Sequence, residues 1–356
     1  VRLIIGGVEY SGWLGARIEA GIERAARSFS LEVTTRWPGS DLVRRVAPGD
    51  ECEVWIGSDK VVTGYVDVAP VAYDGGQVQV QVAGRSRTAD LVDCSAINEP
   101  GQWRGLRVEA VAGALAGVYG VSVVARTDTG PAMIEHQIEP GETVWESVDR
   151  MLTLRQLLAT DDELGRLVLI SAGDAGQASG VLEFGKNILR AAAQRDGSQT
   201  YSEYVCKAQR ATVEQADEDV GTFVTEPMGV ARQTGVSRRR VLVLRESGQA
   251  DAEACAARAQ YELAYRDAKA RQVRYTLNGW RQPDGSLWRV NQLVRVIDEV
   301  IGINEQLLAV EVAYSLSSAG MLCELLLAPC RKRFDATDLI AIEAYLSRAK
   351  ACFCLK

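Results

Sequence analysis

The first hundred residues alternate short apolar runs with turn-forming residues. Runs rich in β-branched residues between turns are typical of strands, and they occur at residues 3–5, 31–35, 53–56, 61–68 and 77–82. Residues 78–82 read Val-Gln-Val-Gln-Val, and this strict alternation predicts a half-buried antiparallel strand. The sequence Asp74-Gly-Gly before it suits a hairpin turn, because glycine accepts positive φ without steric cost. We therefore predict a first small antiparallel β-barrel over residues 1–97.

The pattern changes near residue 98 to a mixture of helix and strand. Residues 108–119 read as a helix, and residues 121–125 and 167–170 read as strands. Thr143 and Glu146 have the spacing of a capping box, in which the hydroxyl accepts from the first turn and the carboxylate reaches back. The helix that they begin is predicted to reach about residue 158. We expect a smaller α/β domain over residues 98–175.

A glycine-rich stretch at residues 171–180 reads as a linker, and β character then returns. Asp251 and Glu253 begin a helix predicted over residues 251–270, since acidic side chains favour the positive end of a helix. Further strands are predicted at residues 273–277, 293–297, 307–314 and 322–327, with a turn at Pro283 and Gly285.

The predicted fold class is therefore α+β and mainly β, with two similar small antiparallel β-barrel domains plus smaller α/β domains. The second barrel is predicted in two parts, residues 176–245 and 281–330, which flank an inserted helix-containing domain over residues 246–280. Residues 331–356 form a C-terminal tail, in which residues 335–350 have the pattern of an amphipathic helix.

Two parts of the chain resemble each other. Ile22-Glu-Arg-Ala-Ala precedes a strand at residues 29–33, and Ile188-Leu-Arg-Ala-Ala precedes residues 201–205; in both we expect a helical turn that leads into a strand. Val66-Asp-Val-Ala and Val310-Glu-Val-Ala each precede a polar turn and another strand. The identities are few, and short β hairpins also resemble one another by chance. A duplicated barrel would let a trimer present six similar barrels around one axis, in a closed ring.

Length and charge narrow the class of protein. The 356 residues favour two to four domains. The net charge of −7 argues against a protein that grips nucleic acid, since such proteins need a cationic surface. Three short basic clusters are interpreted as solvated faces or protein-contact patches: Arg44-Arg45, Arg85-Ser-Arg87 and Arg238-Arg239-Arg240. We expect no transmembrane helix and no signal peptide, because no apolar run is long enough. We therefore expect that the protein is made in a cytoplasm.

Three motifs in the sequence are candidates for catalysis or binding. His136 is the single histidine, and without a Gly-x-Ser-x-Gly elbow it is interpreted as a loop or strand-end residue. Residues 180–187 nearly match a phosphate loop, but Asn187 stands where Mg²⁺ binding needs Ser or Thr, and the middle residues are bulky. The acidic run Asp161-Asp162-Glu163 could suggest metal binding or glycosidase chemistry, but glycosidase carboxylates must face each other across a cleft, which neighbours in sequence do not show. We expect the run to be solvent-exposed at a turn between helix and strand.

The cysteines give no metal or disulfide pattern. The 8 cysteines are scattered without a CxxC pair, and they are expected to be buried free thiols. Cys352 and Cys354 stand close together but lack further ligands at zinc spacing. We predict no catalytic residue, no cofactor and no bound metal, and hence a protein that is not an enzyme.

Several stretches resemble the baseplate hub proteins of Mu-like contractile phages. The most specific is Gly84-Arg-Ser-Arg-Thr-Ala-Asp-Leu-Val-Asp-Cys-Ser-Ala96, which follows Gly64-Tyr-Val-Asp-Val. Residues 140–147, 159–169 and 280–288 together with Asn291 are also similar to this family. The resemblance extends to about Pro329, and the role of residues 331–356 is left open.

The resemblance implies a homotrimeric hub with two β-barrel domains per chain in a pseudo-hexameric ring. It implies a place in the virion tail baseplate, between the tail tube and the central spike, in contact with baseplate wedge proteins, after assembly in the host cytoplasm. It also implies a channel for the tape-measure protein and then DNA, which the acidic charge would let pass without specific binding. The alternatives are the hub of a tailocin or secretion-type injection device, a carbohydrate-binding baseplate protein, and an enzyme; no membrane insertion is expected.

Overall fold

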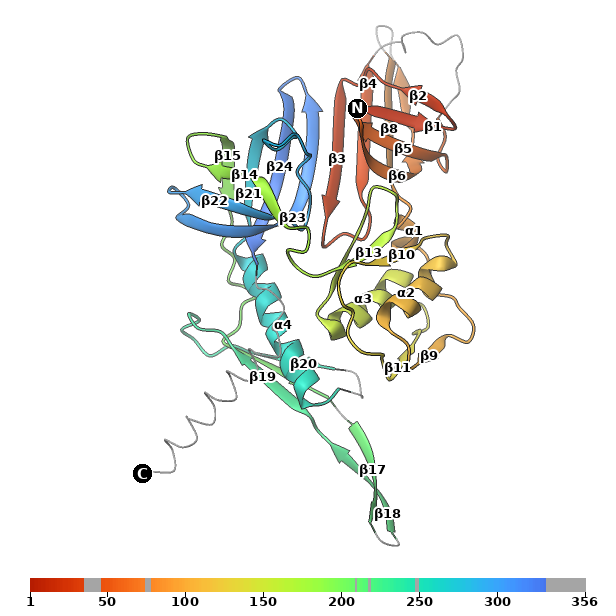
Figure 1. The fold of residues 1–356 in the computed structure, drawn as a ribbon, viewed down its shortest axis with the longest axis vertical. Coiled ribbons are helices and arrows are strands. Elements are labelled where there is room, and N and C mark those ends of the chain that lie inside the picture. The colour runs from red at the N-terminus through yellow and green to blue at the C-terminus, as the bar shows by residue number, and fades with distance from the viewer. Residues whose placement is uncertain (35–45, 74–77, 209, 217–218, 247–249, 331–356) are drawn as a thin grey trace.

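The chain has a mainly β fold with a smaller helical part. In the computed structural model, residues 1–34, 46–73, 78–208, 210–216, 219–246 and 250–330 are described. Two β-rich halves lie side by side at one end of the molecule, and an α/β unit lies below the first half (Figure 1). A long helix leads from the second half to a small sheet and a projecting hairpin at the other end.

The first half is an antiparallel sheet with one face in the core. Its strand order is β3-β4-β8-β6-β5-β1-β2, and β7 also pairs with β8. Leu3, Leu31 and Val62 are fully buried below it. The five strands predicted in this region are confirmed, whereas β2, β3 and β7 were not predicted. The strands are β1 (Arg2–Ile5), β2 (Val8–Tyr10), β3 (Gly15–Gly21), β4 (Ser28–Thr34), β5 (Glu51–Ile56), β6 (Asp59–Val68), β7 (Val71–Tyr73) and β8 (Val78–Ser86).

The second half repeats this strand order. Its six strands are β14 (Gln177–Glu183), β15 (Ile188–Ala193), β21 (Val273–Asn278), β22 (Leu293–Asp298), β23 (Ile303–Ser317) and β24 (Gly320–Pro329). The path β15-β21-β24-β23-β22-β14 matches β3-β4-β8-β6-β5-β1, strand for strand. The pairs are antiparallel in both halves, except that β14 and β22 are parallel. The segments at Val66 and Val310 lie on the equivalent strands β6 and β23.

The other half of the predicted repeat is wrong. Residues 188–193 form strand β15 and not a helical turn, because the edge of β21 offers their backbone a hydrogen-bonding ladder. Residues 203–207 lie in a separate small sheet, so the strand equivalent to β4 is β21. Residues 22–27 form a turn after β3 without a helix.

The two halves form one continuous sheet. Strand β3 of the first half pairs antiparallel with β23 of the second, with Ile18 opposite Tyr314 and Gly21 opposite Glu311. We call this β3–β23 junction the seam. A single buried core of apolar side chains lies under both halves. Hydrogen bonding among the described strands leaves each half as an open path, so closed barrels stay a prediction.

The α/β unit has its own core and follows the predicted pattern. Its elements are α1 (Ala89–Asp93), β9 (Gln102–Arg104), α2 (Val108–Gly117), β10 (Val123–Ala125), β11 (Glu135–Gln137), α3 (Val144–Arg155), β12 (Leu158–Asp161) and β13 (Leu167–Ile170). The capping box of Thr143 and Glu146 is confirmed. Helix α3 ends three residues earlier than predicted, because Gln156 adopts a left-handed conformation with φ of 54° and leads into β12.

An insertion between β15 and β21 carries the long helix. It contains β16 (Glu203–Lys207), β17 (Arg210–Ala216), β18 (Asp219–Thr225), β19 (Met228–Arg232), β20 (Val241–Arg245) and α4 (Ala252–Ala270), which begins at the predicted cap Asp251. The strands of this insertion pair only among themselves within the described chain, so residues 203–245 do not belong to the second β half as predicted. Helix α4 covers the sheet β19-β16-β20, where Gly229 leaves room for the helix backbone at Ala256.

Some predictions fall outside the described residues. These are the hairpin turn at Asp74-Gly-Gly, the helix at residues 335–350, the pair Cys352 and Cys354, and the basic pair Arg44-Arg45. The six described cysteines are free thiols, four of them buried: Cys52, Cys206, Cys255 and Cys323.

Candidate functional site

Six charged side chains form a closed cycle of ion pairs on the exposed face of the sheet across the seam. They come from β3, the turn after it, β21, β23 and β24, so the cycle links both halves. The pairs are Arg17–Glu19 at 2.6 Å, Glu19–Arg24 at 2.7 Å, Arg24–Glu311 at 2.8 Å, Glu311–Arg274 at 3.3 Å, Arg274–Glu324 at 3.7 Å and Glu324–Arg17 at 3.4 Å. We call these six residues the seam network.

The seam network carries no net charge. Burial would raise the pKa of Glu19, but hydrogen bonds and charges from Arg17 and Arg24 outweigh burial, so this pKa lies below its ordinary value. On the same face, Arg85 pairs with Asp67 and with Asp93, each at 2.7 Å. The cations named on this face are therefore held by carboxylates of the same chain, and the neighbouring β4 positions are serines.

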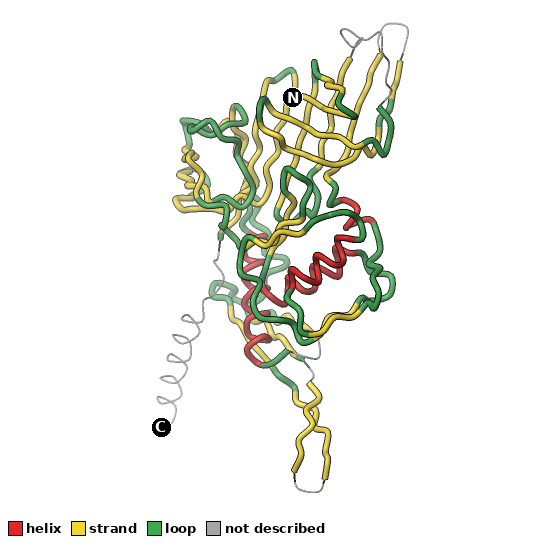
Figure 2. The backbone as a smooth tube through the Cα atoms, turned by 45° about the vertical axis from the view of Figure 1, so that its right-hand side comes forward, coloured by secondary structure: helices red, strands yellow, loops and turns green. Residues whose placement is uncertain are grey.

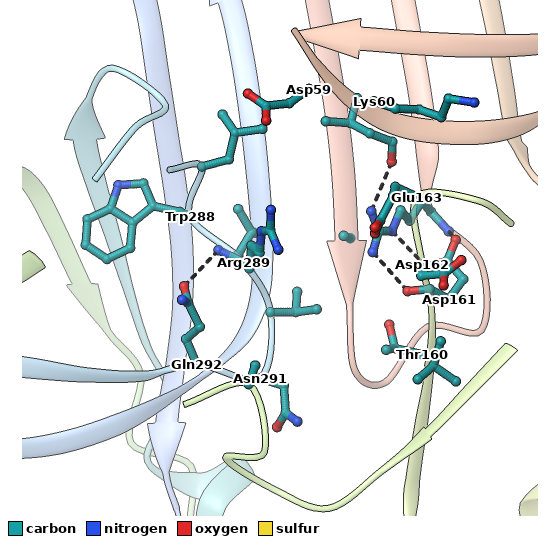
Figure 3. A pocket seen from close by; sticks show the side chains of 18 of the residues that line it. Asp59, Lys60, Thr160, Asp161, Asp162, Glu163, Trp288, Arg289, Asn291 and Gln292 are labelled. Carbon is teal, nitrogen blue, oxygen red and sulfur yellow. Dashed lines mark hydrogen bonds and ion pairs between the residues drawn. The ribbon is translucent and has the colours of Figure 1, made fainter. Parts of the chain in front are cut away.

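A cavity of about 660 Å³ lies on the opposite side of the seam strands. Ile18 of β3 and Tyr314 of β23 form part of its wall, together with the β12–β13 turn and residues 286–292. Figure 3 shows Trp288, Arg289 and Gln292 on one side of this cavity and the acidic run 161–163 on the other. The cavity is the place where both β halves and the α/β unit meet.

Asp161 and Asp162 of the acidic run are buried, which contradicts the predicted exposure, whereas Glu163 is half-buried. Asp161 is 1% exposed, and its carboxylate accepts from the Arg27 guanidinium at 3.1 Å and from the Arg27 backbone at 3.0 Å. The same guanidinium donates to the carbonyl oxygens of Asp161 and Val61, so Arg27 links the α/β unit to the first half. Burial raises the pKa of Asp161, and the charge of Arg27 opposes this rise.

Asp162 is buried too, at 2% exposure, and it closes the β12–β13 turn. Its carboxylate accepts from the backbone of Leu164 and Arg166 and pairs with the Arg166 side chain at 2.6 Å. Both carboxylates are thus used for structure. They are neighbours at one strand end and do not face each other across a cleft, which is the arrangement that glycoside hydrolysis requires.

His136 lies in the core of the α/β unit on β11. Its Nε2 lies 2.8 Å from the Ser147 hydroxyl, and its ring stacks on Trp103 with centroids 6.1 Å apart. Burial first, and then the charge of Arg150, lowers the pKa of His136 to about 4. Ser147 is fully buried on α3, so a substrate has no path to this pair, and we interpret the contact as structural.

The phosphate-loop-like stretch forms a strand end and a turn. Residues 180–183 belong to β14, and Asn187 stabilises the turn by accepting from the backbone of Glu183 at 2.9 Å and donating to the carbonyl of Val181 at 2.7 Å. Gly180 lies against Trp288, where a Cβ atom would come within 2.7 Å of the indole. Gly180 therefore serves packing of β14 against Trp288.

The described residues contain no group of three or more metal-ligating side chains placed to bind one ion. In the same part of the chain, no helix combines the length and the apolar character needed to cross a membrane. The features that link distant parts of the chain are thus the seam, its network and the cavity. Sequence reasoning missed the seam and its network, because β3 and its partner β23 lie almost 300 residues apart.

Comparison with known proteins points to one family along most of the chain. Residues 1–86 match the N-terminal domain of Mu phage baseplate assembly protein GpP-like proteins, and residues 251–336 match the fourth domain of GpP. Residues 88–171 match the second domain of baseplate hub protein gp44-like proteins.

Individual relatives agree with these matches. The chain is 32% identical to baseplate hub protein gp44 of Escherichia phage Mu over 300 residues, which is 83% of this chain and 78% of that protein. The 43 kDa tail protein of prophage MuSo2 from Shewanella oneidensis is 32% identical, with a TM-score of 0.81 over 92% of this chain and 97% of that one. The E. coli c3393 protein, a component of the type VI secretion system, shares the fold at 11% identity, with a TM-score of 0.56 over 94% of this chain and 78% of that one.

Proposed function

The chain belongs to the baseplate hub proteins of Mu-like phages, and from this premise we propose that three copies form a pseudo-hexameric ring at the centre of the tail baseplate. The ring joins the tail tube to the central spike and contacts the wedge proteins around it. Its central channel passes the tape-measure protein and then DNA. The chain assembles in the host cytoplasm and acts as a structural protein without catalytic activity.

The observation that carries the ring is the strand-for-strand match of the two halves. Strand β3 of the first half occupies the edge of β23, and the strands equivalent to these two are β15 and β6. Three chains with two equivalent halves each present six similar units around one axis, so a single chain type can contact threefold and sixfold neighbours.

Two open strand edges supply the joint between copies. Strand β15 is an edge strand in the described sheet, and Leu189 on it is 61% exposed. After β6 ends, β7 continues along β8, and Val71 there is 63% exposed. Unpaired strand edges invite further pairing. We propose that β15 of one copy pairs with the β6–β7 edge of the next, so that the contact between copies repeats the seam.

The seam network supports the channel. A wall with free arginines would bind DNA through phosphate contacts and counterion release. In the seam network three arginines are matched by three glutamates, so the network itself leaves no cation unpaired for phosphate. We therefore propose that this face of the sheet lines the channel.

The fold likeness to a type VI secretion component favours one alternative. The same architecture would serve as the hub of a tailocin or secretion-type device. Gene context separates a phage hub from these alternatives. A tailocin lacks capsid genes, and a secretion system lacks phage structural genes.

Negative-stain electron microscopy of the purified chain, averaged without imposed symmetry, tests the ring. We expect open rings with threefold symmetry and a nearly sixfold outline. Compact monomers that persist after addition of spike and tube proteins would refute the proposal.

A further inference from the structure

The continuous sheet contains the same unit of strands twice, head to tail. Its path runs β15-β21-β24-β23 in the second half and then β3-β4-β8-β7 in the first half, where β7 continues the line of β6. The two halves lie side by side in both views (Figures 1 and 2). The unit of the second half ends at β23, and β3 occupies its edge. The unit of the first half ends at β7, which pairs with β8 alone among the described strands.

Backbone hydrogen bonds align the two units residue by residue. Val66 exchanges hydrogen bonds with residues 49–50, and Ala309 exchanges them in the same way with residues 291–292. Directly after these residues, both strands carry a register shift against the next strand. Val66 is therefore equivalent to Ala309, one residue away from the sequence match with Val310.

The same alignment shows which side chains replace the seam network at the two free edges. Five of its six charged positions have an equivalent in the aligned strands, and every equivalent is uncharged. The replacements are Ala192 for Arg17, Gln194 for Glu19, Val68 for Glu311, Ser30 for Arg274 and Gln81 for Glu324. Thus β3 and β15 have equivalent backbones, but only β3 carries the charges that the edge of β23 needs.

Strand β15 directs unpaired backbone groups to its free edge. Gln194 donates its backbone N–H to the carbonyl of Gln272 at 3.4 Å, so residue 194 faces the neighbouring strand. Because these groups alternate in direction along an antiparallel strand, Ala191 and Ala193 point theirs away from β21. Residues 189–193 are all exposed.

Strand β7 directs its backbone groups outward at the matching positions. Pro70 accepts from the backbone N–H of Gln81 on β8 at 3.2 Å, so residue 70 faces β8. By the same alternation, Val71 and Tyr73 point their N–H and C=O groups away from β8. The side chain of Val71 is 63% exposed, whereas Tyr314, its equivalent at the seam, is 7% exposed.

We propose that β15 pairs with β7 of the next copy in the register of the seam, and that the seam network reserves the edge of β23 for β3 of the same chain. In this register Ala193 lies opposite Val71 and Ala191 opposite Tyr73, and each of these two pairs exchanges two backbone hydrogen bonds. The inference rests on the proposed ring. It adds the register of the joint between copies and the reason that each strand takes its own edge.

The charges oppose the wrong pairing in both directions. If β15 occupied the edge of β23, Ala192 would stand in the place of Arg17, and Glu324 would keep only Arg274, at 3.7 Å. If β3 occupied the edge of β7, Arg17 and Glu19 would lie among uncharged side chains. Two backbones that fit either edge are thus distinguished by side-chain charge.

Pairs of cysteines in the full-length chain test the register. Ala72→Cys with Ala192→Cys creates a pair without hydrogen bonds, whose Cα atoms lie about 4.5 Å apart, within the range for a disulfide. Oxidation in air with a copper catalyst should give covalent dimers and trimers. Each single variant controls for the native cysteines and should give monomers. Ala72→Cys with Arg190→Cys, shifted by two residues, should cross-link at least about tenfold more slowly.

The choice of edge is tested by giving β3 the side chains of β15. The exchange is Arg17→Ala with Glu19→Gln, and the reporter is Ala192→Cys with Ser315→Cys. These two cysteines of different copies meet only if β15 occupies the edge of β23. We expect little of this product in the reporter chain alone and at least about tenfold more after the exchange.

The matched control removes an exposed ion pair away from the seam. Arg232→Ala with Glu203→Gln in the same reporter chain should not increase the product. An independent check is Ala192→Arg with Gln194→Glu, which gives β15 the charges of β3. This variant, if folded as judged by its circular dichroism, should weaken the trimer at least about tenfold in sedimentation velocity.

The outcomes separate this inference from the proposed ring. Rings in electron microscopy without a disulfide between positions 72 and 192 would overturn the register and leave the ring intact. Covalent trimers without a gain of the 192–315 product would overturn the role of the seam network in the choice of edge. A wild-type chain that stays monomeric at every concentration would overturn the ring and the joint together.

Discussion

Single residues hold the units of this chain together through buried polar contacts. Arg27, in the turn after β3, donates to Asp161 at the end of β12 and to the carbonyl of Val61 on β6. Its side chain is 16% exposed, and that of Asp161 is fully buried. Removal of either partner would leave the other as an uncompensated buried charge. This lowers the free energy of unfolding far more than the loss of a surface ion pair does.

Arg27→Met is therefore expected to destabilise the chain by about 3–5 kcal/mol in urea unfolding. The double variant Arg27→Met with Asp161→Asn should recover much of this loss, since no buried charge is left alone. Arg2→Met, which removes an exposed pair with Glu9, is the matched control and should change stability by less than about 1 kcal/mol. Equal losses of stability in Arg27→Met and Arg2→Met would show that the Arg27–Asp161 ion pair contributes no more than an exposed pair.

His136 gives a pH signature, because it is the only histidine of the chain. Its pKa is lowered from 6.5 to about 4 in the folded state, so the unfolded chain binds its proton first as the pH falls. The stabilisation from neutral His136 is complete above about pH 6.5 and is lost progressively as the pH falls from there toward 4. Thermal melts of the wild type between pH 7 and 5 should show this decline, and His136→Gln should flatten it. An unchanged slope in the variant would assign the decline to other groups.

At the scale of elements, the sequence pattern predicts those helices and strands whose formation depends on neighbouring residues. The alternation in β8 and the cap Asp251 of α4 depend on neighbours in the sequence, and both elements were predicted. Strand β15 was not, because its Ala-rich sequence favours helix and only the edge of β21 makes it a strand. The burial of Asp161 depends on Arg27, 134 residues earlier, so the sequence alone indicated an exposed turn.

Close packing of β8 against β6 leaves no room for a side chain at Gly84. A Cβ atom on Gly84 in β8 would lie 2.1 Å from the carbonyl oxygen of Tyr65 and 2.8 Å from the Phe29 ring. Gly84→Ala must push β6 away from β8, and we expect a loss of about 3 kcal/mol in urea unfolding. Gly113→Ala in α2 is the control, because no atom lies within 4 Å of its Cβ position and alanine favours helix. A neutral Gly84→Ala would mean that the strands adjust at little cost.

At the scale of the whole molecule, the continuous sheet makes one surface from two distant parts of the chain. The seam joins residues 16–21 to residues 311–316, and the seam network crosses it on one face while the core lies on the other. Family resemblance indicated a hub, but the face proposed to line the channel emerged only from this pairing. The neutrality of the seam network is a property of the assembled sheet, since its arginines and glutamates come from both halves.

Because the seam network is neutral, we expect that the wild-type chain does not bind DNA. Glu19→Gln, Glu311→Gln and Glu324→Gln together leave Arg17, Arg24 and Arg274 without their carboxylates. We expect this triple variant to bind double-stranded DNA in fluorescence anisotropy at about 50 mM salt, with affinity that falls steeply as salt rises, whereas the wild type does not bind. A control that neutralises the exposed Glu253, Glu299 and Glu305 changes the net charge equally. Equal DNA binding by the two variants would mean that the change in net charge alone causes the binding. Binding by the seam variant only would show that the paired carboxylates prevent the seam network from binding DNA in the proposed channel.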